Sequence, residues 1–109
     1  MDWQHLSSEH AIEEITELSK DKPVFVFKHS PTCSISALVL NRVEKNFRSE
    51  NLSFIPIIVD VIKEKTISAA IAQKWHVHHE SPQALFIQDG NCTYSASHMN
   101  IILKSFPNT

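Results

Sequence analysis

The chain has 109 residues, a length that suits one domain with a single hydrophobic core. Its hydrophobic content of 42% and charged content of 20% are ordinary for a globular protein. Because 10 basic and 12 acidic residues give a formal net charge of −2, nothing in the composition attracts nucleic acid or an anionic membrane, and partners of both kinds are disfavoured.

The amino-terminal half alternates helical and strand patterns. Apolar residues at helical spacing predict a helix over Ser8–Lys20, and the continuous apolar run Val24–Phe27 predicts a central strand covered on both faces. A second helix is expected over Ile35–Phe47. The next strand, Phe54–Val59, contains Pro56, which cannot donate to a sheet ladder, so this strand should lie at an edge.

The carboxyl-terminal half predicts a third helix over Glu64–Trp75. The runs Ala84–Ile87 and Cys92–Ala96 flank the turn pair Asp89-Gly90 and form an antiparallel hairpin. A last helix is expected over His98–Phe106, with the preceding serine as its cap.

These elements predict an α/β fold over residues 1–109. A strand-helix-strand unit needs parallel strands joined by a right-handed crossover, and the terminal hairpin adds two antiparallel strands to the same sheet. We therefore expect a central mixed sheet of about four strands flanked by helices, with a terminal antiparallel hairpin.

Cys33 is the residue with the clearest chemical potential. It lies at the start of the second predicted helix, where a thiolate faces unpaired backbone N–H groups and the positive end of the helix dipole. Three positions later, where a dithiol oxidoreductase carries a second cysteine, the chain has Ser36. The motif Cys-Ser-Ile-Ser therefore predicts a reactive thiol without a resolving neighbour; a packed, idle cysteine is the plainer alternative.

The other thiol, Cys92, follows the hairpin turn at the end of the sheet away from Cys33, too far for the ~5.5 Å Cα separation that a disulfide needs. The first residues lack a secretory signal and no apolar stretch approaches the ~20 residues that span a bilayer, so we expect a cytoplasmic protein. A reducing compartment also disfavours a permanent disulfide. The single glycine, Gly90, disfavours phosphate-binding loops and nucleotide cofactors.

Several segments together resemble the thioredoxin superfamily: the strand Val24–Phe27, the helix start at Cys33, and Ser81-Pro82 at the head of a later strand. Within that superfamily, the segment Lys28–Ser36 is similar to the active-site segment of the monothiol bacilliredoxins, bacterial proteins that use bacillithiol as their small thiol. The resemblance covers nearly the whole chain. One departure is Ser34, where the family usually has proline, and it leaves the nucleophile in place.

The resemblance implies a thioredoxin-like fold and a thiol-disulfide oxidoreductase. The Cys33 thiolate would attack a mixed disulfide between a client protein and bacillithiol, take bacillithiol onto itself and release the client reduced. Because Ser36 cannot resolve this species, bacillithiol or a partner reductase would complete the cycle. The expected partners are thus S-bacillithiolated clients, with bacillithiol as co-substrate, no permanently bound cofactor and a monomeric protein.

The resemblance gives catalytic roles to Cys33 and Ser36 and substrate-binding roles to a further set of residues. That set comprises Lys28, His29, Thr32, Ser34, Ile35, Ser81, Pro82 and His98. It implies that Pro82 is cis and faces the nucleophile, with the backbone of Ser81 bonding the thiol compound; the base rate for X-Pro bonds favours trans. His98 is expected either to line the groove at the active-site end of the sheet or to be a solvated histidine at a helix start.

Other residues of the set have open interpretations. Ser36 either hydrogen-bonds the Cys33 sulfur or only caps the helix, and Thr32 is a plausible N-cap. Lys28 and His29 could supply positive charge near the thiolate or meet the carboxylates of bacillithiol, whereas Lys28 is as well explained as a solvated residue at a strand end.

Two further patterns bear on the chemistry. Phe27 and His29 occupy the positions that correspond to a buried acid and a tryptophan in dithiol thioredoxins, so the buried proton acceptor of those proteins is absent. His76, His78 and His79 form a cluster in one loop, but a loop without converging partners is more often polar surface, and we expect no metal site.

Two other functional classes remain open. A monothiol glutaredoxin-like iron–sulfur carrier would hold a cluster between two subunits, but such carriers have glycine and phenylalanine where this chain has Ser34 and Ile35. A non-catalytic adaptor would use the thioredoxin fold as a binding surface.

Overall fold

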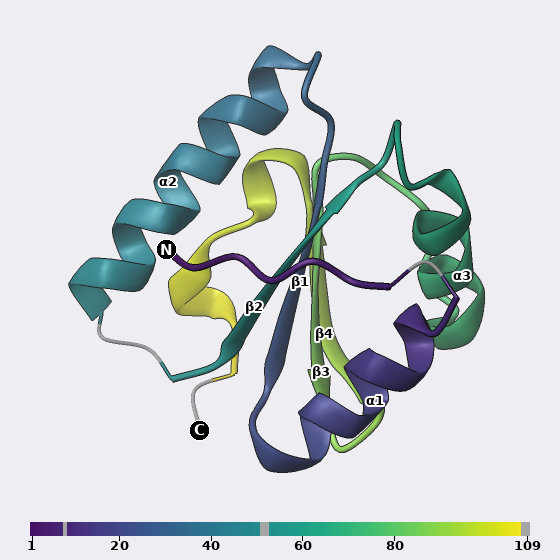
Figure 1. The fold of residues 1–109 in the computed structure, drawn as a ribbon. Helices are drawn as coiled ribbons and strands as arrows, with labels where there is room; N and C mark the ends of the chain where they lie inside the picture. Colours follow the sequence, from purple (N-terminus) through teal and green to yellow (C-terminus); the bar gives the residue numbers. More distant parts are fainter. Residues whose placement is uncertain (8, 51–52, 108–109) are drawn as a thin grey trace.

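The sheet at the centre of the protein has four strands and helices on both faces (Figure 1). The computed structural model describes residues 1–7, 9–50 and 53–107, and of residues 49 and 50 the backbone only. The strands are β1 (Val24–His29), β2 (Ile55–Asp60), β3 (Gln83–Gln88) and β4 (Asn91–Ser97), in the order β2-β1-β3-β4. β1 and β2 are parallel, and the other neighbouring pairs are antiparallel. The predicted mixed sheet with its terminal hairpin is confirmed.

Helices cover both faces of β1, which explains its continuous apolar run. Val24 and Val26 belong to the core between the sheet and α1 (Ala11–Asp21) and α3 (Lys65–Trp75), whereas Phe25 and Phe27 belong to the core beneath α2 (Ser34–Glu50). All four side chains are fully buried. Burial of side chains this large contributes roughly 1.5–3 kcal/mol each, so β1 anchors both halves of the fold.

β2 lies at the edge of the sheet, as Pro56 predicts. On its outer side the backbone of Gln4 runs parallel to it: Gln4 N donates to Pro56 O at 2.9 Å, and Ile58 N donates to Gln4 O at 3.1 Å. The amino-terminal segment thereby covers part of an edge that would otherwise expose unpaired backbone groups. α1 begins at Ala11, and Ser8, the first residue of the predicted helix, lies outside the described residues.

The β3–β4 turn consists of the predicted pair Asp89-Gly90. Both residues have positive φ, 49° and 79°, as a two-residue hairpin turn of this hand requires. Side chains of two helices hold the turn: Gly90 N donates to Ser19 Oγ at 2.8 Å, and Trp75 Nε1 donates to Gly90 O at 3.0 Å. The hairpin is thus fixed at the end of the sheet next to α1.

The predicted carboxyl-terminal helix is wrong. The chain instead makes two short 3-10 turns, His98–Asn100 and Leu103–Ser105. The buried residues are Ile101, Leu103 and Phe106, a spacing that no single helical face supplies, and each of them packs into the core beneath α2. Tertiary packing therefore overrides the weak helical pattern, and the serine before the first turn makes no capping bond. None of the described helices is long and apolar enough to cross a membrane.

Candidate active site

Cys33 is the N-cap residue of α2. Its carbonyl accepts the first helical hydrogen bond, from Ala37 N at 3.1 Å, and its own N–H donates to Ser30 O at 3.1 Å. Thr32, which the sequence suggested as the cap, is exposed in the turn before it. The Cys33 thiol is free and half-exposed. The sulfur therefore lies at the amino end of a 17-residue helix, in a residue that is partly exposed to solvent.

Ser36 is fully buried one turn after Cys33. Its Oγ lies 2.7 Å from His29 Nδ1 and accepts a hydrogen bond from Ser30 N at 3.0 Å. A neutral imidazole protonated at Nε2 lets the hydroxyl donate to Nδ1 while accepting from the backbone. These contacts differ from both roles considered from the sequence, a bond to the sulfur or a helix cap, because they fasten the first turn of α2 to the end of β1.

The burial of His29 favours its neutral form, which accepts at Nδ1 when the proton is on Nε2. Burial lowers the pKa of its imidazole below the ordinary value, although the carboxylates of Asp60 and Glu44 act in the opposite direction. The positive charge expected beside the thiolate is therefore disfavoured at neutral pH. Of the two positions that correspond to a buried acid and a tryptophan in dithiol thioredoxins, Phe27 is a fully buried apolar residue and His29 contacts the hydroxyl of Ser36.

Lys28 points to the opposite face of the sheet from His29, because successive side chains of a strand alternate. It is fully buried against α3, where its Nζ donates to Ser68 O at 3.0 Å and lies 3.2 Å from His79 Nδ1. Burial lowers the pKa of the ammonium to about 8. Lys28 is therefore neither solvated nor directed at the face that carries α2 and Cys33.

Pro82 lies at the same end of the sheet as the start of α2. Gln83, which follows it, pairs with Lys28 near the end of β1, and the Ser81-Pro82 peptide bond is cis, as the resemblance implies. Pro82 O accepts a hydrogen bond from His98 N at 2.8 Å. Ser81 Oγ is buried, and among the described residues it has no hydrogen-bonding partner.

An apolar surface borders the first turns of α2. Ile35 is 43% exposed and Leu38 is 55% exposed, while Met99 of the neighbouring 3-10 turn is 46% exposed. Arg42 ties the two segments together, because its Nη2 donates to Met99 O at 3.1 Å and to Ile101 O at 2.6 Å. Of the predicted binding residues, Ser34, Ile35 and His98 are exposed in these two segments.

Cys92 lies at the far end of the hairpin, as predicted. Figure 1 shows the β3–β4 turn and the start of α2 at opposite ends of the sheet. The six residues of β3 separate these ends by about 17 Å at a strand rise of about 3.4 Å per residue. The Cys92 thiol is half-buried and contacts Tyr94 O at 3.5 Å, and burial raises its pKa. It is poorly placed to resolve a disulfide on Cys33.

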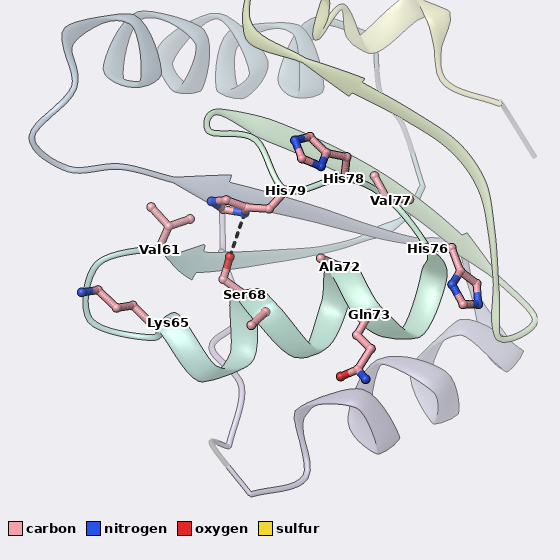
Figure 2. Close-up of a pocket in the computed structure, with 10 residues that line it drawn as sticks. Val61, Lys65, Ser68, Ala72, Gln73, His76, Val77, His78 and His79 are labelled. Carbon is pink, nitrogen blue, oxygen red and sulfur yellow. Dashed lines mark hydrogen bonds between the residues drawn. The ribbon is translucent and has the colours of Figure 1, made fainter.

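A groove of about 750 Å³ follows α3 and the loop after it (Figure 2). Its lining residues are Val61, Lys65, Ser68, Ala69, Ala72, Gln73, His76, Val77, His78 and His79. Within the described ranges, no three or more His, Cys, Asp or Glu side chains are grouped so that they could hold a metal ion. The contacts of Lys28 with Ser68 and His79 were not predicted. Ser68 is 40 residues and His79 is 51 residues from Lys28 in the chain, so no local pattern indicates them.

Comparison with known proteins agrees with this geometry. A solved structure described as a candidate oxidoreductase with a thioredoxin fold has 34% sequence identity over 93% of this chain and 87% of that chain, with a TM-score of 0.79. A thioredoxin from Fasciola hepatica has 18% identity over 87% of this chain and 86% of its own, with a TM-score of 0.70. Thioredoxin f2 from Chlamydomonas reinhardtii has 12% identity over 89% and 84%, with a TM-score of 0.69. The two thioredoxins show the fold alone.

The family model for the monothiol bacilliredoxin BrxC matches residues 4–106. This match and the candidate oxidoreductase indicate a thiol redox function on a thioredoxin fold. The chain belongs to the monothiol bacilliredoxin family.

Proposed function

We propose that the protein removes bacillithiol from S-bacillithiolated proteins through a mixed disulfide on Cys33. The observation that carries the proposal is the contrast between Cys33 and Ser36. The thiol is half-exposed at the start of α2, whereas the residue in the resolving position is a buried hydroxyl held by His29. The site can therefore accept a small thiol but cannot discharge it internally.

The first step is a thiol-disulfide exchange. The Cys33 thiolate attacks the bacillithiol sulfur of the client mixed disulfide, a bond forms between Cys33 Sγ and that sulfur, and the client sulfur leaves as a thiolate. The client is reduced by two electrons, and the disulfide is carried over to Cys33. The position of the sulfur at a helix amino terminus supports this step, because backbone N–H groups and the helix dipole stabilise a thiolate there.

The second step needs a thiol from outside. The thiolate of free bacillithiol attacks the bacillithiol sulfur bound to Cys33, forms bacillithiol disulfide and releases the Cys33 thiolate. A reductase with its own thiol would perform the same exchange. Cys92 cannot substitute in this role, because it lies at the opposite end of the sheet.

Ser81, Pro82 and His98 are proposed to border the bound thiol compound. Their placement at the end of the sheet where α2 begins supports this role. The backbone of Ser81 is proposed to bond the thiol compound, whereas its Oγ is buried and no described residue bonds it. The exposed apolar residues Ile35 and Met99 offer a surface for the client chain.

Single-turnover measurements test the proposal. An excess of bacillithiolated client is mixed with reduced protein and no free bacillithiol, and client reduction is followed by intact mass. We expect one equivalent of bacillithiol to leave the client for each protein molecule consumed, and continuous turnover only after free bacillithiol is added. Cys33→Ser should abolish both phases, and Cys92→Ser should leave both unchanged. Continued turnover without any added thiol would contradict the monothiol cycle.

The remaining expectations from the sequence stay predictions. They are a cytoplasmic location, a monomeric state, and the use of bacillithiol as a co-substrate without a permanently bound cofactor or metal.

A further inference from the structure

Lys28 is the most unusual group outside the described chemistry. It is a fully buried lysine in the central strand, and no carboxylate of the described residues forms an ion pair with it. Burying an ammonium is costly unless hydrogen bonds compensate it. Its two recorded contacts, Ser68 O at 3.0 Å and His79 Nδ1 at 3.2 Å, belong to two separate segments of the chain.

The direction of these contacts is fixed by chemistry. A protonated lysine only donates, so His79 Nδ1 must accept and its imidazole carries the proton on Nε2. The Ser68 hydroxyl lies 3.2 Å from the same nitrogen, and Figure 2 shows His79 turned toward Ser68 across the inner wall of the groove. The ammonium of Lys28 and the hydroxyl of Ser68 therefore share the single lone pair of His79 Nδ1, and both contacts direct the ring toward α3.

His79 lies in the loop that leads to Pro82. Within this segment Gln83 Nε2 donates to His78 O at 2.9 Å, and at its end Pro82 O accepts a hydrogen bond from His98 N at 2.8 Å. The bond between Gln83 and His78 closes the segment 78–83 on itself, the bond from His98 joins it to the turn after β4, and His79 joins it to Lys28.

His29, the next residue of β1, bonds the part of the candidate site that contains Cys33. His29 points to the α2 face and holds Ser36 in the first turn of α2, the turn that begins at Cys33. Lys28 and His29 are consecutive, and their side chains leave opposite faces of one rigid strand. Each half of the candidate site is therefore bonded to the same dipeptide.

We propose that Lys28 is a positioning residue: through His79 it fixes the Ser81-Pro82 segment relative to Cys33, while His29 fixes the helix start. Lys28 touches neither the thiol nor the substrate in this role. The inference rests on the proposed function for its catalytic consequence, but the positioning itself is measurable without any substrate.

Amide hydrogen exchange tests the positioning directly. The His98 N–H reports on the Pro82 segment, because Pro82 O is its acceptor, and the Ala37 N–H reports on the helix start, because Cys33 O is its acceptor. Losing a hydrogen bond from a charged donor should speed local opening by about tenfold or more. We expect Lys28→Met to accelerate exchange at His98 by this factor and to leave Ala37 within about twofold.

Two control comparisons make the test specific. Lys65 lines the groove together with Ser68 and His79 but is exposed, so Lys65→Met should change neither amide. His79→Asn retains a side-chain acceptor and should preserve the protection of His98, whereas His79→Leu should lose it even where Lys28→Met folds poorly. Equal acceleration of both amides by Lys28→Met would indicate general destabilisation and overturn the inference, as would unchanged exchange at His98.

The KM for a bacillithiolated client and the alkylation rate of Cys33 separate the positioning role of Lys28 from the proposed function. If the protein transfers bacillithiol, Lys28→Met should raise the KM for a bacillithiolated client by about tenfold, while iodoacetamide alkylates Cys33 at the wild-type rate within about twofold. An unchanged KM would overturn the positioning role. If the wild-type protein transfers no bacillithiol, the proposed function fails, and the exchange of His98 against Ala37 still decides whether Lys28 positions the Pro82 segment.

Discussion

The Ser36 hydroxyl lies 2.7 Å from Nδ1 of His29, at the position where a dithiol thioredoxin-fold protein carries its second cysteine. The contact replaces a resolving thiol with a buried hydrogen bond between the first turn of α2 and the end of β1. The hydroxyl oxygen also accepts a hydrogen bond from Ser30 N at 3.0 Å, and the hydroxyl donates to His29 when the imidazole proton is on Nε2. Ser36 therefore has a structural role that its position in a redox motif does not reveal.

Removing this hydroxyl should destabilise the fold. Ser36→Ala leaves the Ser30 N–H and the His29 nitrogen without their partner, which should lower the free energy of unfolding by about 1–3 kcal/mol. Urea denaturation measures the loss. The matched control is Ser34→Ala, an exposed serine in the same turn, for which we expect a change within about 0.5 kcal/mol. Equal effects of the two substitutions would contradict the assignment.

Restoring a thiol at this position should convert the site to a dithiol centre. In Ser36→Cys the new thiol is one helical turn from Cys33, so it should attack the Cys33–bacillithiol disulfide, expel bacillithiol and leave an intramolecular disulfide. Intact mass should then lack the bacillithiol adduct and be about 2 Da lower than that of the reduced protein. Ala37→Cys, one residue further along the helix, is the control and should retain the adduct. Persistence of the adduct in Ser36→Cys would contradict the geometry.

Much of the fold follows from local patterns in the sequence. The apolar run at Val24–Phe27 predicts a strand covered on both faces, Pro56 predicts the edge, and Asp89-Gly90 predicts the hairpin turn, because each pattern reflects a backbone requirement. The final helix fails for the opposite reason. Burial of Ile101 and Phe106 beneath α2 depends on a core that no local window contains.

The candidate site likewise has features that the local sequence predicts and contacts that it does not. The motif and the resemblance placed Cys33 at a helix start and Pro82 as a cis proline, and the structure has both features. Side chains alternate along a strand, so the sequence alone indicates that Lys28 and His29 face opposite sides of the sheet. Both residues were nevertheless predicted to lie near the thiolate. The contacts of Lys28 with Ser68 and His79 could not be predicted, because they depend on tertiary structure.

The buried ammonium of Lys28 should make stability depend on pH. Its pKa is about 8 in the folded protein, against 10.5 for an ordinary lysine, so between these values the unfolded chain binds more protons and stability rises with pH. The full difference corresponds to at most about 3–4 kcal/mol, and we expect about 1–2 kcal/mol after a discount for solvent screening.

Lys28→Met removes this dependence, so the comparison isolates it from other titrating groups. Urea unfolding of both proteins between pH 7.5 and 10.5 should show the wild type gaining about 1–2 kcal/mol relative to the variant as the pH rises. A constant difference between the two curves would mean that the ammonium is not held in a low-pKa environment.

The two cysteines should differ sharply in reactivity. Burial raises the pKa of Cys92, whereas the half-exposed Cys33 thiol lies at a helix amino terminus, so limiting iodoacetamide at pH 7.5 should label Cys33 first. We expect a rate ratio of about tenfold or more by peptide mapping. Faster labelling of Cys92 would contradict the assignment of the nucleophile.

The most direct test of the account is to locate the transferred bacillithiol. The reduced protein is incubated with a bacillithiolated client, quenched with acid and digested, and the peptides containing Cys33 and Cys92 are analysed by mass spectrometry. We expect the bacillithiol mass on Cys33, in step with its loss from the client, and no adduct in Cys33→Ser. Bacillithiol on Cys92, or a client that keeps its bacillithiol, would contradict it.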